Sequence, residues 1–339
     1  MNKKEETAIS LYSVAPNSKI IEKAFCTNVP IYPSKKIIYL AALLLGLFIP
    51  LVFIYCILLF DTKILSKKDI TDRLTLPYLG EISSSNDKVL KVMSRTSSSE
   101  AFRIVRANLE YVIKTLPVKS EINCKKIFIT STIPKEGKTF VGVNLAIAFS
   151  QVNKKVLLVG LDIRNPKFAE YLENINTNQG LTNYLSQEEK PISDYIQYDS
   201  QNKISVLTSG IIPPNPTDIL LSFKIEKVFS DLEKMYDFII VDTSPVSLVS
   251  DTILISNLAD YFVFVLRYDY SEKRFLDDID DLRKEGKIEN VSLLLNDFPI
   301  KRGYGYGYGY GYGVDKEKST VLEKFRNFLF KNKFNKNEY

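Results

Sequence analysis

Short apolar runs alternate with helix-like segments from residue 125 onward. The runs are continuously apolar, which is typical of strands buried on both faces of a sheet. The runs are residues 127–129, 156–159, 204–207, 238–241, 261–266 and 291–295, and helical patterns between them include residues 140–151, 219–235 and 272–285. This order predicts an α/β fold with a doubly wound, mostly parallel sheet, in which ligands bind at the carboxyl ends of the strands.

The first run leads into a tight loop at residues 134–139 (PKEGKT), and a helical pattern follows it. In such a unit the backbone N–H groups cradle the phosphates of a nucleotide, the lysine neutralises their charge, and the hydroxyl binds Mg²⁺. The usual first glycine of G-x-x-x-x-G-K-[ST] would fall at Thr132, so the loop alone is an incomplete match. A glycine turn before a helix, with an incidental lysine, is the alternative interpretation.

Two aspartates follow apolar runs at positions where they would meet this loop. Asp162 comes just after the run at 156–159, and Asp242 directly follows the run at 238–241. Carboxylates at the ends of parallel strands are placed to hold Mg²⁺ or its bound waters. One such aspartate is weak evidence, because loops favour aspartate anyway. Two of them, together with Gly-Lys-Thr, predict a magnesium–nucleotide site.

An uncharged, apolar run at residues 37–60 is long enough to cross a bilayer as one helix. Roughly 24 helical residues span the hydrocarbon core, and a proline such as Pro50 is tolerated there. The run starts too late and is too long for a cleaved signal peptide, and a buried core helix is the other alternative. Lysines flank both ends, so charge bias does not set the orientation. A nucleotide-binding domain needs cytoplasmic ATP, which places the C-terminal side inside the cell.

The chain is therefore predicted to have five parts. These are a short extracytoplasmic segment (1–36), a transmembrane helix (37–60), a juxtamembrane linker (61–99), a P-loop domain (100–300) and a tail (301–339). The P-loop domain opens with a helix on which Glu100, Arg103 and Arg106 lie along one side, because they recur every three residues. That side is either a solvated, self-paired face or a surface that meets a neighbouring subunit.

The tail begins with a strict Gly-Tyr alternation over residues 303–313. An extended segment of this kind places every ring on one face and offers nothing apolar to the other, so it forms no packed core. The tyrosines are Tyr304, Tyr306, Tyr308, Tyr310 and Tyr312. They are either a low-complexity tail with weak contacts or a row of phosphate acceptors. The basic amphipathic stretch at 321–334 either lies on an anionic membrane surface or packs on its own domain.

The amino-acid composition argues against several other kinds of site. The net charge of +5 over 339 residues is too weak to predict nucleic-acid binding. The chain contains no histidine, which excludes histidine bases and histidine metal ligands. Its three cysteines, Cys26, Cys56 and Cys124, are too scattered to suggest a zinc site or a disulfide framework.

Together the motifs resemble the bacterial protein-tyrosine kinases of capsular and exopolysaccharide biosynthesis, which are autokinases on a P-loop ATPase fold. Residues 134–139 resemble the Walker A motif of that family, residues 160–164 its Walker A′ and residues 238–242 its Walker B. The helix with Glu100 matches its E-x-x-R-x-x-R motif, residues 210–216 its Pro-Pro-Asn-Pro loop, and the tail its tyrosine cluster. The likeness covers about residues 69–313 and extends upstream through the membrane segment.

The resemblance implies ATP- and Mg²⁺-dependent phosphorylation of tyrosine. It implies ATP binding by Lys135, Glu136, Gly137, Lys138, Thr139 and Phe140, Mg²⁺ binding by Thr139, Asp162 and Asp242, and catalysis by Lys138, Asp162 and Asp242. It also implies a homo-oligomeric ring, formed through the charged helix, in which the tail is phosphorylated in trans. Expected partners are a polysaccharide co-polymerase or exporter, a tyrosine phosphatase and the cell membrane.

Three features depart from the family pattern. The second aspartate of Walker A′ falls at Gly160, so another group must activate the phenol or the rate is low. Lys135 stands where a glycine is usual and adds positive charge near the phosphates. Full-length members carry a large extracytoplasmic domain between two membrane spans, whereas this sequence begins just ahead of the second span. We therefore expect a kinase half with its last span, or a truncated product.

Two other functions are alternatives to the kinase. A catalytically weak or silent membrane subunit of the polysaccharide export machinery is favoured by Gly160 and by the missing outer domain. A MinD/ParA-like ATPase switch is disfavoured, because the signature lysine of that class aligns with Ile133. The membrane span and the tyrosine tail also argue against such a switch.

Overall fold

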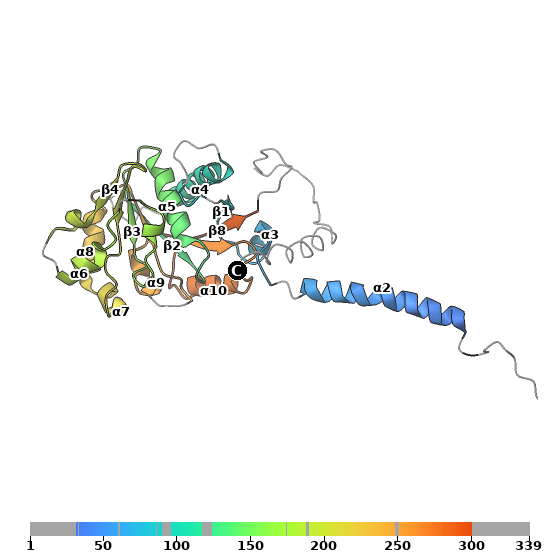
Figure 1. Cartoon of the computed structure of the whole chain (residues 1–339). Helices are drawn as coiled ribbons and strands as arrows, with labels where there is room; N and C mark the ends of the chain where they lie inside the picture. Colours follow the sequence, from blue (N-terminus) through green and yellow to red (C-terminus); the bar gives the residue numbers. More distant parts are fainter. Residues whose placement is uncertain are drawn as a thin grey trace, which may run out of the picture. The chain divides into compact units, whose positions relative to one another are not determined.

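The structure is a computed structural model of the chain (Figure 1). It describes residues 32, 34–59, 62–85, 87–89, 96–116, 124–173, 175–187, 190–247 and 251–299. The chain forms two compact units, Met1–Thr62 and Lys63–Tyr339, and each is described by itself.

The first unit contains a long helix, α2 (Lys35–Leu59), with Pro50 inside it. The stretch Lys35–Cys56 reaches a mean hydropathy of 2.8, and its most apolar part has no buried residues. By length and composition α2 is able to cross a membrane, as expected for residues 37–60.

The second unit is built on a sheet whose described strands number eight, in the order β1-β8-β7-β2-β6-β3-β5-β4. All neighbours are parallel except β4 and β5. The strands are β1 (Tyr78–Ser83), β2 (Lys125–Ser131), β3 (Val156–Gly160), β4 (Gln197–Asp199), β5 (Ile204–Leu207), β6 (Phe238–Asp242), β7 (Tyr261–Arg267) and β8 (Val291–Phe298). The six apolar runs form β2, β3 and β5 to β8, which confirms the predicted doubly wound, mostly parallel sheet.

Helices cover both faces of the sheet because the strand side chains alternate between two apolar cores. In β2, Ile127 and Ile129 face one core and Phe128 faces the other. The first core also takes apolar side chains from α4 (Ser97–Lys114) and α5 (Lys138–Ser150). Helices that supply the second core are α3 (Lys67–Thr71), α6 (Leu181–Gln187), α7 (Pro216–Leu220), α8 (Phe223–Leu232) and α10 (Phe275–Lys284). Short elements complete the unit: α9 (Asp251–Leu254), η1 (Phe168–Glu170), η2 (Ile192–Tyr195) and η3 (Ser256–Leu258).

Two strands and one helix break were not predicted from the pattern. Strand β1 lies in the segment expected to be a linker, and its Leu79 and Ile82 are buried in the core beneath α4. Strand β4 is a three-residue antiparallel edge strand. The expected helix at 219–235 is divided into α7 and α8, because Ser222 adopts an extended conformation between them.

Candidate active site

The phosphate-binding loop joins the end of β2 to the start of α5. Gly137 precedes α5 with a left-handed φ of 96°, and a Cβ atom there would lie 2.1 Å from Asn296 Nδ2. Only glycine therefore fits this position without displacing Asn296. Lys135 has a φ of 65°, which is why a glycine is usual at its position.

Glu136 fastens this loop to the sheet from inside the protein. Its side chain is fully buried, Ile133 N donates to its Oε2 at 2.9 Å, and Ser271 Oγ donates to its Oε1. Asn296 Nδ2 donates to its main-chain oxygen at 3.0 Å. Burial raises the pKa of Glu136, against these hydrogen bonds. The carboxylate thus faces the protein, and Glu136 is absent from the residues that line the cavity described below.

Lys138, Thr139 and Asp242 form the charged centre at the carboxyl ends of β2 and β6. Lys138 is 7% exposed, and burial lowers its pKa against the attraction of Asp242, Asp162 and Glu136. Thr139 Oγ1 donates to Asp242 Oδ2 at 2.7 Å. Burial raises the pKa of Asp242 to about 7. A nucleotide's phosphates therefore meet one largely desolvated ammonium group beside a buried carboxyl group.

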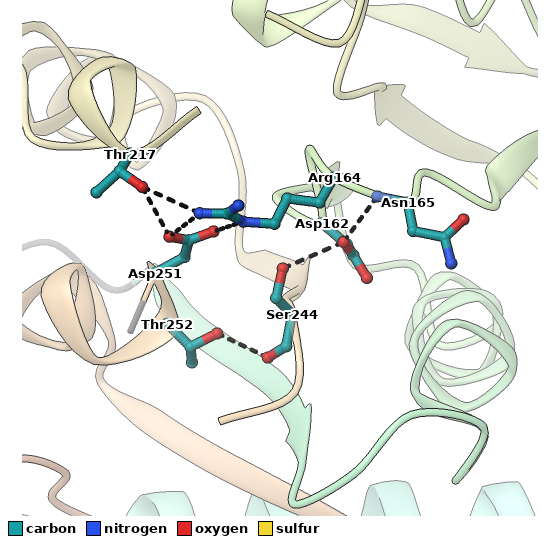
Figure 2. Close-up of polar contacts among 7 residues, drawn as sticks. All are labelled: Asp162, Arg164, Asn165, Thr217, Ser244, Asp251 and Thr252. Atoms are coloured by element: carbon teal, nitrogen blue, oxygen red, sulfur yellow. Dashed lines mark hydrogen bonds and ion pairs between the residues drawn. The ribbon is translucent and has the colours of Figure 1, made fainter. Parts of the chain in front are cut away.

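Asp162 is held at the end of β3, the strand next to β6. The backbone N–H groups of Leu161 and Asp162 donate to Asp242 O at 2.8 and 3.0 Å. The carboxylate of Asp162 accepts a hydrogen bond from Ser244 Oγ and another from the Asn165 N–H, each at 3.1 Å (Figure 2). Ser244 was not predicted as a site residue. The only indication in the sequence was a hydroxyl residue two positions after Asp242.

Arg164 ties the same loop to two distant segments (Figure 2). Its Nε and Nη2 donate to the two oxygens of Asp251 at 2.6 and 3.0 Å, and Nη2 also donates to Thr217 Oγ1 at 3.0 Å. Asp251 is 2% exposed and opens α9, and Thr217 follows the Pro-Pro-Asn-Pro sequence in α7. No sequence pattern predicted Asp251, which lies 87 positions from its partner Arg164.

A cavity of about 620 Å³ opens over these groups, which is the size of a nucleotide site. Predicted site residues that line it are Lys135, Gly137, Lys138, Thr139, Phe140 and Asp162. Glu136 and Asp242 lie behind this wall. Residues of the wall that were not predicted include Lys88, Arg164, Lys167, Tyr171, Ser244, Arg267 and Asn296.

The donor atoms at the floor of the site fit a magnesium ion. Asp242 Oδ1 is buried and has no hydrogen-bond partner among the described residues, and Thr139 Oγ1 touches the other oxygen of the same carboxylate. The described residues contain no group of three acidic, histidine or cysteine side chains that would cage a metal by themselves. Such a sparse oxygen set suits Mg²⁺, which takes one or two carboxylates and keeps waters and phosphates as its other ligands.

Gly160, at the position of the second aspartate of the family motif, is closely packed. A Cβ atom at Gly160 would lie 3.0 Å from Ser209 N and 3.2 Å from Phe168 Cε2, and Phe168 is 4% exposed. A side chain at this strand end would therefore press on the aromatic ring and on the Ser209 backbone, and these neighbours would have to shift by a few tenths of an ångström.

Restoring that carboxylate with Gly160→Asp is expected to destabilise the protein without raising its activity. Displacing a buried ring costs about 1–3 kcal/mol. Urea unfolding of the wild type, Gly160→Asp and the matched variant Gly160→Ala measures this, with Gly160→Ala losing a similar amount. A faster Gly160→Asp enzyme of unchanged stability would contradict this account of the loop.

The three charged residues of the α4 motif have partners within the chain. Arg103 pairs with Glu100 at 2.7 Å, and both are partly exposed. Arg106 is 17% exposed, donates to Ala148 O in α5 at 2.8 Å and lies 3.6 Å from Glu110. Arg106 therefore joins α4 to α5, while Glu100 and Arg103 remain accessible. The tyrosines at 304–312 lie outside the described residues.

The segment that carries the site matches known nucleotide-binding and kinase proteins. A family model described as an AAA domain matches residues 124–289, the segment that contains the phosphate-binding loop and both aspartates. The tyrosine-protein kinase YwqD of Bacillus subtilis is 35% identical over 181 residues, which cover 53% of this chain and 72% of YwqD. The chain belongs to the family of bacterial tyrosine-protein kinases of the capsule and exopolysaccharide type.

Other relatives match a larger share of the chain. A putative tyrosine-protein kinase in the cps region of Klebsiella pneumoniae is 28% identical over 303 residues, which are 82% of this chain but only 40% of that protein. Among solved structures, the chimerical protein CapA2B2 has a TM-score of 0.61 and 30% identity over 69% of this chain and all of that one. The kinase domain of Escherichia coli ETK, at 23% identity, shares the fold with a TM-score of 0.62, covering 74% of this chain and all of that domain.

Proposed function

We propose that the protein is an ATP-dependent tyrosine autokinase that regulates the polymerisation or export of a capsular or extracellular polysaccharide. One observation carries the proposal: Lys138, Thr139 and Asp162 line one cavity, directly above Asp242, in a chain of the tyrosine-kinase family. The capsule context comes from relatives such as the Klebsiella protein, which is named for the cps region.

In the proposed reaction a phenol oxygen attacks the γ-phosphorus of ATP, the bond to the β,γ-bridging oxygen breaks, and ADP leaves. Lys138 and the backbone of residues 135–139 hold the phosphates. Thr139 and Asp242 would hold Mg²⁺, with Asp162 reaching it directly or through water, and the ion would neutralise phosphate charge. A phenol has a pKa near 10, so it must lose its proton as it attacks. Asp162, whose carboxylate is held by Ser244 and Asn165, would accept that proton.

The proposed acceptors are the tyrosines Tyr304, Tyr306, Tyr308, Tyr310 and Tyr312 of a neighbouring copy. Glu100 and Arg103 support self-association because they are accessible charged groups on one side of α4. Arg106 would act on assembly indirectly, by fixing α4 against α5. In this arrangement α2 anchors a ring of copies in the cell membrane, with the second unit in the cytoplasm.

Phosphorylation would switch the ring through charge. Each phosphate adds about −1.5 to −2 charges, so several on one short tail repel each other and the acidic site. Release of the tail and disassembly of the ring follow, and a tyrosine phosphatase would reset the system. A polysaccharide co-polymerase or exporter would respond to the alternation between the assembled and disassembled ring. Equal oligomer size before and after dephosphorylation would argue against this switch.

A second candidate, a catalytically silent subunit of the export machinery, is favoured by one observation. Phe168 fills the space beside Gly160, so the loop has one carboxylate where the family pattern has two.

Phosphotyrosine detection separates these functions. The full chain, purified in detergent, is incubated with ATP and Mg²⁺ beside Lys138→Met and a variant with all five tail tyrosines changed to phenylalanine. Signal in the wild type alone supports the kinase. A wild type that stays unlabelled even with candidate partner proteins present supports the silent subunit.

A further inference from the structure

Lys167 is a cation on the wall of the nucleotide cavity that the sequence motifs did not identify. It lies in the loop between β3 and η1, five residues after Asp162, and its side chain lines the cavity with Lys138. Among the residues that the structure describes, no carboxylate or carbonyl group pairs with its ammonium group. Burial raises the pKa of Asp242 and lowers that of Lys138, and the charge of Lys167 acts on both groups in the lowering direction.

The loop that presents Lys167 is fixed on both sides of it. Before Lys167, the carboxylate of Asp162 is held by Ser244 and Asn165, and Arg164 is bound through two hydrogen bonds to the buried Asp251 (Figure 2). After Lys167, the buried ring of Phe168 packs beside Gly160. The ammonium group is therefore carried by an anchored loop.

The loop differs from the expected pattern in two charges: a carboxylate is missing at position 160, and a lysine is present at position 167. Position 160 holds a glycine packed against Phe168 where a carboxylate was expected, and the lysine directly before Phe168 lines the cavity. Two ammonium groups at one cavity repel each other when nothing lies between them. A polyphosphate between them removes that repulsion and gains from both charges.

The strand order indicates which phosphate of a bound nucleotide Lys167 would meet. Strand order places the phosphate-binding loop after β2, Asp242 after β6 and the Lys167 loop after β3, in adjacent strands. The opposite flank of the loop, where Arg267 Nη1 donates to Lys135 O at 3.0 Å, belongs to β7. If Lys138 holds a phosphate chain that runs toward Asp242 and Asp162, the terminal phosphate would lie on the Lys167 side of the site.

We propose that Lys167 is a second phosphate-binding lysine, which contacts the γ-phosphate of ATP and neutralises charge on the transferred group. The inference rests on the nucleotide site of the proposed function. The β3–η1 loop would then bind a nucleoside triphosphate more tightly than a diphosphate, because ADP has no γ-phosphate for Lys167 to contact.

Nucleotide binding by the full chain in detergent tests this role. Affinities for Mg²⁺–AMP-PNP and Mg²⁺–ADP are measured by titration calorimetry for the wild type, Lys167→Gln, Lys167→Arg and Lys154→Gln. Lys154 is an exposed lysine between α5 and β3 that does not line the cavity, so its variant removes the same charge elsewhere. Because Lys167→Gln removes one charge-assisted contact to the γ-phosphate, we expect AMP-PNP binding to weaken about tenfold and ADP binding less than about twofold. Lys167→Arg and Lys154→Gln should stay near the wild type.

The inference is overturned if Lys167→Gln binds AMP-PNP as well as the wild type does, or if it loses affinity equally for both nucleotides. A wild type that binds neither nucleotide also overturns it. Kinase activity is judged separately: a wild type that shows the AMP-PNP preference but forms no phosphotyrosine supports the role of Lys167 and contradicts the autokinase.

Discussion

Asp242→Asn is expected to make the metal-free protein more stable above pH 7 while abolishing its binding of magnesium–nucleotide. The carboxyl group is fully buried, and burial raises its pKa from an ordinary 3.8 to about 7. Between these two values the folded state retains a proton that the unfolded state has released. Stability therefore falls as the pH rises from about 4 to about 7, and then levels off. An asparagine carries no such charge.

The pH dependence of unfolding measures this effect. Urea unfolding is followed in EDTA at pH 5 and pH 8 for the wild type, Asp242→Asn and the control Asp162→Asn, whose carboxylate is only partly buried. The gain at pH 8 is at most about 4 kcal/mol, from roughly 1.4 kcal/mol for each pH unit between the two pKa values. Parallel pH profiles for the wild type and Asp242→Asn would show that the carboxyl group is not strained when ionised.

Lys138→Met is expected to reduce phosphotyrosine formation by roughly a thousandfold with little loss of stability. The ammonium group is 7% exposed and faces phosphates with little water to screen it, where a charge contributes most to phosphoryl transfer. Methionine nearly matches the shape of the side chain and removes a buried charge. The wild type should bind Mg²⁺–ATP more tightly than this variant does.

A matched control separates this lysine from the general charge of the loop. Lys135→Met removes the same charge three residues earlier, where the main chain accepts a hydrogen bond from Arg267 and the residue is exposed. We expect a loss of less than about tenfold there, as for a solvated charge. Initial rates of tail phosphorylation measure both variants, and equal losses would contradict the specific role of Lys138.

The sequence predicted the parts of the fold that follow from uniform burial. Strands β2, β3 and β5 to β8 are covered on both faces, so their apolar runs stand out. Strand β1 was not predicted, because Gly80 and Glu81 separate its two buried residues and no continuous apolar run results. Strand β4 is too short for any period to register, and the turn at Ser222 carries no proline or glycine to mark it.

In the site, the sequence predicted residues that belong to local motifs and missed those that act across the chain. Lys138, Thr139, Asp162 and Asp242 each follow a strand in a recognisable pattern, and the structure brings them to one edge of the sheet. The inward orientation of Glu136 depends on Ser271, which comes 135 residues later. No periodicity links such pairs, because their proximity is created by the crossover connections of the sheet.

A mixing experiment tests the central claim, that this cavity transfers phosphate from ATP to tyrosines of another copy. A full-length Lys138→Met chain with an intact tail is combined with a chain of wild-type site whose five tail tyrosines are phenylalanines. After incubation with ATP and Mg²⁺, the tails are analysed by mass spectrometry. We predict phosphate on residues 304–312 of the Lys138→Met chain in the mixture and in neither chain alone. A mixture that remains unphosphorylated would contradict transfer between copies, and a wild type that is also unphosphorylated would contradict the kinase itself.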